Sequence, residues 1–133
     1  MRRVEGLAEI VLWVHDMDAA LHFYRDGFGL ELISPPEFPN KFLRAGKGGA
    51  GIPEMVVLVP HPDPAVVFPR EKAKRVLHHM AFRVDATGYD DLQLHFMTEG
   101  VEIRTGVHPI LKGARTIYVD DPDGNEVEVI SPA

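Results

Sequence analysis

Apolar and polar residues alternate along several short stretches of the chain, which is the pattern of half-buried β-strands. In the stretch 9–14, the residues from Ile10 to Val14 put an apolar side chain on one face at every second position, and Glu9 lies on the other face. Further stretches of this kind cover residues 30–33, 42–45, 54–59, 79–84, 113–119 and 125–130. Apolar residues at helical spacing predict one helix after residue 16 and a second around residues 89–96.

The second half of this pattern repeats the first. Residues 79–84 overlay residues 9–14, and Gly100 with the three residues after it overlays Gly29 and its successors. The repeat predicts two tandem βαβββ modules, about 7–59 and about 77–131, joined by a connector at 60–76, in a single domain of residues 1–133. The predicted fold class is α+β, in which the two modules form an open, barrel-like mixed sheet with the helices outside.

Three connecting segments have a distinct composition. Residues 46–51 contain four glycines and predict a flexible loop. The proline-rich connector carries a basic cluster, which we interpret as a solvated loop face; the alternative is a grip for an anionic substrate. The cluster comprises Arg70, Lys72, Lys74 and Arg75. Residues 121–125 predict a tight acidic turn, because Pro122 fixes φ and both Gly124 and Asn125 tolerate positive φ.

Composition narrows the class of protein. The chain has 133 residues and a net charge of −6, which argues against nonspecific nucleic-acid binding. No apolar run approaches the roughly 20 residues that span a bilayer, and no signal-peptide core follows the N-terminus, so we expect a cytoplasmic protein without a membrane partner. The absence of cysteine excludes disulfides and thiolate sites, but seven histidines and many carboxylates permit a metal site with nitrogen and oxygen ligands.

Three of these metal-capable side chains are predicted to converge. Glu9 and His79 occupy equivalent positions in the first strands of the two modules. On the last strand, Val127 and Val129 match the helix-covered face, which turns Glu128 to the opposite face. Glu9, His79 and Glu128 would then meet on one concave surface. The alternative is that the glutamates of the last strand face water, as on any half-buried strand.

Four stretches of the chain resemble the vicinal oxygen chelate superfamily of glyoxalases, bleomycin resistance proteins and extradiol dioxygenases: residues 9–16, 23–30, 78–84 and 121–128. The resemblance implies a divalent metal ion held by Glu9, His79 and Glu128. Glu9 departs from the usual histidine or glutamine, and a fourth ligand, often a glutamate, would fall near Val56, which cannot coordinate. One imidazole and two carboxylates suit Fe²⁺, Mn²⁺ or Co²⁺.

The C-terminal region resembles the extradiol ring-cleavage dioxygenases in more detail. That resemblance assigns His108 and Tyr118 to catalysis beside the metal; the alternatives are a loop histidine and a core tyrosine. The implied function is a metal-dependent enzyme whose small oxygenated substrate chelates the ion, as in ring cleavage. One alternative is a glyoxalase-like lyase or isomerase, in which Glu9 or Glu128 doubles as the base. The other is a metal-free, bleomycin-resistance-like protein that binds a small molecule.

Two further residues share the predicted ligand face. Trp13 and Arg83 suggest a partly aromatic substrate pocket with one cation. By strand alternation, we expect His78 to point away from His79. The expected partners are a small-molecule substrate and, by the resemblance, a second copy of the chain in a homodimer; neither nucleic acid nor a membrane is expected.

Overall fold

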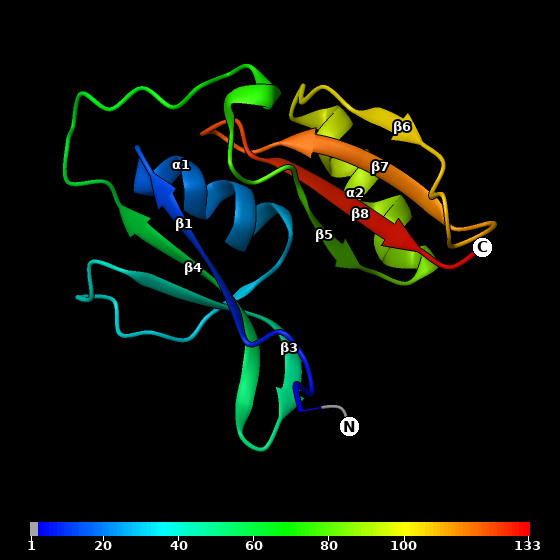
Figure 1. Ribbon diagram of the computed structural model, residues 1–133, viewed down its shortest axis with the longest axis horizontal. Coiled ribbons are helices and arrows are strands. Elements are labelled where there is room, and N and C mark those ends of the chain that lie inside the picture. The colour runs from blue at the N-terminus through cyan, green and yellow to red at the C-terminus, as the bar shows by residue number, and fades with distance from the viewer. Residues whose placement is uncertain (1–2) are drawn as a thin grey trace. The chain divides into compact units, whose positions relative to one another are not determined.

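The computed structural model describes residues 3–133, which divide into two compact units that meet in sequence at Val66 and Val67. Each unit contains one four-stranded sheet and one main helical segment (Figure 1). The first unit consists of β1 (Glu9–Val14), α1 (Met17–Leu21), the π-helix η1 (His22–Gly27), β2 (Glu31–Leu32), β3 (Lys41–Gly49) and β4 (Ile52–Pro60). The second consists of the short η2 (Lys72–Lys74), β5 (Met80–Arg83), α2 (Ala86–Thr98), β6 (Arg104–Gly106), β7 (Arg115–Asp120) and β8 (Glu126–Ser131).

The two sheets have the same topology. Their strand orders are β1-β4-β3-β2 and β5-β8-β7-β6. The first strand of each module pairs in parallel with the last, and all other pairs are antiparallel. The predicted fold class, α+β with two tandem βαβββ modules, is confirmed.

The helices begin and end with the same local chemistry in both modules. Asp16 and Asp85 cap their helices, since each side chain accepts a hydrogen bond from a backbone N–H three residues later. Gly29 and Gly100 follow the helices with φ of 78° and 72°, a left-handed conformation that costs glycine little. These equivalent glycines account for the sequence repeat at this point.

Each sheet buries one apolar face against its own helix. In the second unit, four strand residues are fully buried: Ile117, Val119, Val127 and Val129. They pack with Tyr89, Leu92 and Phe96 of α2, whose exposed fractions are at most 8%. In the first unit, the corresponding buried residues include Leu12, Val14, Leu43 and Leu58 from the strands, with Ala20 and Tyr24 from the helical segment. This burial is the main source of stability. The sheet face opposite the helix is not needed for this packing and can carry polar side chains.

The glycine-rich segment is not the flexible loop that we expected. β3 continues to Gly49 and β4 begins at Ile52, so the two strands form a long hairpin with bulges. A Cβ atom at Gly48 would lie 1.9 Å from the backbone oxygen of Ile52, and one at Gly46 would lie 2.3 Å from Oε1 of Glu54. The glycines therefore allow close strand pairing.

Over the described part of the chain, no helix is both long enough and apolar enough to cross a bilayer.

Candidate metal centre

The sheet face of the second unit that points away from α2 is polar. Antiparallel register places Tyr118 of β7 opposite Glu128 of β8, and Asp120 opposite Glu126. Alternation sends these side chains to the face opposite the buried valines of β8. The turn before β8 is fixed by Asp121, whose carboxylate accepts hydrogen bonds from the backbone N–H groups of Asp123 and Asn125. Of the two turn residues expected to tolerate positive φ, only Gly124 adopts it, with φ of 85°.

His79 and Glu128 are in direct contact on this face. Nε2 of His79 lies 3.1 Å from Oε1 of Glu128. The Glu128 residue is only 2% exposed, and its second oxygen, Oε2, has no hydrogen-bond partner among residues 3–133. A buried carboxylate oxygen without a partner is costly, and buried anions are normally paired with cations or metals. One imidazole nitrogen beside such a carboxylate is a donor set that fits a divalent cation.

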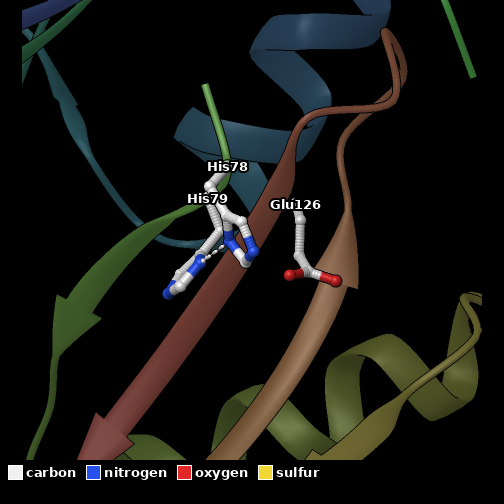
Figure 2. Close-up of side chains that lie close together, drawn as sticks. All are labelled: His78, His79 and Glu126. Carbon is white, nitrogen blue, oxygen red and sulfur yellow. Dashed lines mark hydrogen bonds between the residues drawn. The ribbon is translucent and has the colours of Figure 1, made fainter. Parts of the chain in front are cut away.

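His78 contacts the second nitrogen of the His79 ring, Nδ1 (Figure 2). The two Nδ1 atoms lie 2.7 Å apart, so one of them must carry the hydrogen. If Nε2 of His79 binds an ion, its Nδ1–H donates to Nδ1 of His78, which then fixes the orientation of the ligand ring. The expectation that His78 points away was wrong. Strand β5 starts only at Met80, so alternation does not govern the two residues before it.

His78, His79 and Glu126 form a second cluster, with one ligand-type atom from each lying within 4.8 Å of the others (Figure 2). Glu126 is already engaged by two cations, since it binds Nζ of Lys72 and accepts a hydrogen bond of 3.1 Å from Nη2 of Arg104. Burial raises the pKa of Glu126, but the hydrogen bonds from Lys72 and Arg104 outweigh it and lower the pKa below its ordinary value. We therefore favour Glu128 over Glu126 as the carboxylate that a metal would recruit.

Tyr118 lies beside the His79 and Glu128 pair. Its ring is edge-on to the His79 ring, with 5.9 Å between centroids. Burial raises the pKa of Tyr118, and the neighbouring Glu128 carboxylate raises it further. The hydroxyl group therefore keeps its proton at neutral pH and can donate it in a hydrogen bond. Gly106 makes room for the ring, because a Cβ atom there would lie 2.9 Å from Cε2 of Tyr118.

The other predicted residues of the second unit lie elsewhere. Nδ1 of His108 accepts hydrogen bonds from the backbone N–H groups of Ile110 and Leu111, at 3.2 and 3.0 Å, so this side chain shapes its own loop. Arg83 is exposed at the end of β5. A catalytic role for His108 and a pocket role for Arg83 stay predictions.

Glu9 and Trp13 belong to the first unit. Glu9 is exposed at the first residue of β1, on the same sheet face as Val11 and Trp13. Trp13 is 52% exposed, packs edge-on against the His61 ring at 4.9 Å and, with Val11 and Val59, lines a shallow apolar pocket. That Glu9 completes the ligand set of His79 and Glu128, and that Trp13 contacts substrate, stay predictions.

Known proteins support this architecture. The family model that describes the Glyoxalase/Bleomycin resistance protein/Dioxygenase superfamily matches residues 6–129 of this chain. Among solved structures, a glyoxalase/dioxygenase from Nostoc punctiforme is similar with a TM-score of 0.75 and 22% identity, over 97% of this chain and 92% of that one. A lactoylglutathione lyase from Agrobacterium tumefaciens has a TM-score of 0.67 and 24% identity, over 98% and 96% of the two chains. The fosfomycin resistance protein FosX from Listeria monocytogenes has a TM-score of 0.66 and 23% identity, over the same shares. At these identities the likeness is one of fold.

Proposed function

Because the chain belongs to the Glyoxalase/Bleomycin resistance protein/Dioxygenase superfamily, we propose that it is a divalent-metal-dependent enzyme acting on a small oxygenated substrate. His79 and Glu128 hold the ion, and Glu9 is the third ligand. The observation that carries the proposal is the buried Glu128 carboxylate, which places one oxygen 3.1 Å from the His79 imidazole and leaves the other without a hydrogen-bond partner among the described residues.

The proposed ligand atoms determine which metal ions fit the site and which chemistry a bound ion provides. One imidazole with carboxylates suits Fe²⁺, Mn²⁺ or Co²⁺ better than softer ions. Three protein ligands leave positions for two adjacent substrate oxygens, and a bound ion supplies Lewis-acid polarisation of those oxygens. The protein's own share is to orient the ligands, and His78 does this for His79 through the contact between their Nδ1 atoms.

Ring cleavage of a catechol-type substrate is the specific reaction that we favour. Its support is Tyr118, whose protonated hydroxyl group stands beside His79 and Glu128 and can donate a hydrogen bond to a substrate oxygen. His108 is the second residue that we assign to this chemistry, as a proton donor or acceptor from its loop.

A glyoxalase-like lyase or isomerase is the second candidate, and a lactoylglutathione lyase shows that this fold can carry such a reaction. Such a reaction needs a carboxylate that accepts a proton from carbon. Glu126 is a weak base, because Lys72 and Arg104 hold its pKa below the ordinary value. The base would therefore be Glu9 or Glu128. A metal-free binding protein is the third candidate.

Three measurements on the purified full chain separate these candidates. Metal content is determined after purification without chelator and again after incubation with Fe²⁺, Mn²⁺ or Co²⁺. Oxygen uptake is then followed with catechols, and exchange of carbon-bound hydrogen with solvent is followed with 2-oxo and hydroxy acids. Bound metal with oxygen uptake supports ring cleavage, whereas bound metal with hydrogen exchange alone supports the lyase. Failure to bind any of these ions would leave only the binding protein.

A further inference from the structure

A pocket in the second unit lies between the connector and the turn that joins β7 to β8. Four cationic side chains line it: Arg70, Lys72, Arg75 and Arg104. His78 and the two carboxylates of Asp120 and Glu126 line it as well. Ligand-type atoms of His78 and Glu126 lie within 4.8 Å of one on His79 (Figure 2). The pocket therefore adjoins the candidate metal centre, and the basic cluster noted in the sequence contributes three of its four cations.

Only two of these four charges are compensated by carboxylates. Lys72 pairs with Glu126, and Arg104 pairs with both Glu126 and Asp120. Arg70 and Arg75 form no ion pair within the described part of the chain. Arg70 donates to the backbone oxygen of Pro122 at 3.4 Å. Arg75 donates to the backbone oxygen of Pro69 and, at 2.7 Å, to Oδ1 of Asn125. Neutral partners leave the positive charges of both arginines in place, in a chain whose net charge is −6.

The two uncompensated guanidinium groups converge on one point. A Cβ atom at Gly124 would lie 2.9 Å from Nη1 of Arg70 and 3.1 Å from Nη1 of Arg75. Like charges repel, so their convergence without a carboxylate is unfavourable until an anion is present. Each guanidinium has five N–H donors, and the hydrogen bonds that these two arginines form within residues 3–133 use only a minority of them. Planar N–H forks of this kind match the oxygens of carboxylate and phosphoryl groups.

We propose that this pocket binds an anionic oxygen group of the substrate, a carboxylate or a phosphoryl group, so that the substrate is a small acid. The proposal rests on the proposed function, because it assigns the pocket to the substrate of the His79 and Glu128 centre. Arg70 and Arg75 bind the anionic group, and the neighbouring oxygens of the same molecule face the metal ligands. Arg104 and Lys72, neutralised by their carboxylates, form the wall between the two subsites.

The first test measures anion binding without metal. The chelator-treated full chain is titrated with inorganic phosphate and, separately, with acetate at constant ionic strength, and the backbone amide resonances of Gly124 and Asn125 are followed by NMR. We expect saturable shifts. In Arg70→Gln and Arg75→Gln, the Kd of the preferred anion should rise about tenfold to a hundredfold, because each change removes charged hydrogen bonds. The stronger of the two anions identifies the group as phosphoryl or carboxylate.

Matched variants separate binding from folding. Lys74→Gln makes the same change of charge in the same connector. Lys74 is exposed, pairs with Glu71 at 3.2 Å and does not line the pocket. The Kd of the anion for Lys74→Gln should therefore equal that for the wild type. Arg75→Lys keeps the charge and should bind the anion better than Arg75→Gln. Shifts that do not saturate, or equal Kd values in Arg70→Gln and Lys74→Gln, would overturn the anion site.

The second test connects the pocket to the metal. With Mn²⁺ bound, the ³¹P nucleus of phosphate in the pocket should relax rapidly, and Arg70→Gln should abolish this effect. Bound Mn²⁺ without enhanced ³¹P relaxation would overturn the assignment of the pocket to the substrate. A chain that binds phosphate through Arg70 and Arg75 but never binds Mn²⁺ would instead contradict the proposed metal function and leave the anion site intact, so the two failures are distinguishable.

Discussion

The two modules share one backbone plan and differ in the sheet face that points away from the helix. Because Ile10 pairs with Val56 and the equivalent Met80 pairs with Val127, the register matches each residue of β4 with one of β8. Three positions of the first module are apolar where the second is polar: Phe42, Met55 and Val57 correspond to Tyr118, Glu126 and Glu128. The resemblance predicted a fourth ligand position near Val56, and by this register the residue equivalent to Glu128 is Val57.

The difference suggests that the helix-covered faces serve stability, whereas the polar face of the second module serves the proposed chemistry. The helix-covered faces are apolar in both modules, and their burial stabilises both folds in the same way. The polar face of the second module instead buries a carboxylate oxygen that has no hydrogen-bond partner within residues 3–133, which a sequence selected only for stability would avoid. The first module contributes an apolar surface around Trp13 and, as we propose, the single ligand Glu9. Exchanging residues between equivalent positions tests this division.

The largest effect is expected from Val57→Glu, which gives the first module the residue that stands at position 128 in the second. Val57 is 2% exposed, so the new carboxylate is buried without a cation. We expect the free energy of unfolding to fall by about 3–5 kcal/mol in urea titrations with chelator present. Val11→Glu, on the same face but 53% exposed, is the control and should change it by less than about 0.5 kcal/mol. Equal stability of the two variants would contradict the comparison.

A smaller loss is expected from Gly106→Ala. The added methyl group would lie 2.9 Å from Cε2 of Tyr118 and must displace that ring. Overpacking of this kind should lower the free energy of unfolding by about 1–2 kcal/mol. In the double variant Gly106→Ala with Tyr118→Ala, the two effects should be far from additive, because the clash is gone. Additive effects would show that Gly106 does not determine the position of Tyr118.

Glu128→Val is expected to stabilise the protein. Valine is the residue at the equivalent position 57, and the change removes a buried oxygen that has no hydrogen-bond partner in the described part of the chain. Without metal, the free energy of unfolding should rise by about 1 kcal/mol, because the change removes the desolvation cost of a buried carboxylate and the His79 side chain, which is 31% exposed, can bind water instead. Urea titration in chelator measures this. A loss of stability instead would mean that Glu128 serves the fold through His79 and Tyr118.

The smallest effect concerns Glu126 and pH. Its folded-state pKa lies below the ordinary value of 4.5, so the ion pairs with Lys72 and Arg104 stabilise the protein above that pH. This contribution is lost as the pH falls through the lowered pKa. Glu126→Gln should therefore be less stable than the wild type by about 1 kcal/mol at neutral pH, and the difference should shrink in acid. Met55→Gln, at the equivalent position of the first module, should show no such pH dependence.

The sequence predicted the repeat and the boundaries of β1 correctly, because alternation and the helix-ending glycines are local signals. It did not predict the bulged hairpin of β3 and β4, since glycines that permit close strand pairing look the same as glycines of a loop. It also misplaced His78, because the strand starts one residue later than the alternation suggested. The pairing of Glu126 with Lys72 and Arg104 depends on side chains far apart in the chain, which no local pattern reveals.

Titration with Co²⁺, followed by the visible absorption of the bound ion, tests the metal centre most directly. We expect one ion per chain in the wild type. Changes to groups that only support a ligand cost about tenfold to a hundredfold in affinity, so His79→Ala and Glu128→Ala, which remove ligands, should raise the Kd by more than about a hundredfold. Glu31→Gln, on an exposed residue of β2, should leave the Kd unchanged. Equal Co²⁺ affinity in the wild type, His79→Ala and Glu128→Ala would contradict the assignment of these residues as the metal centre.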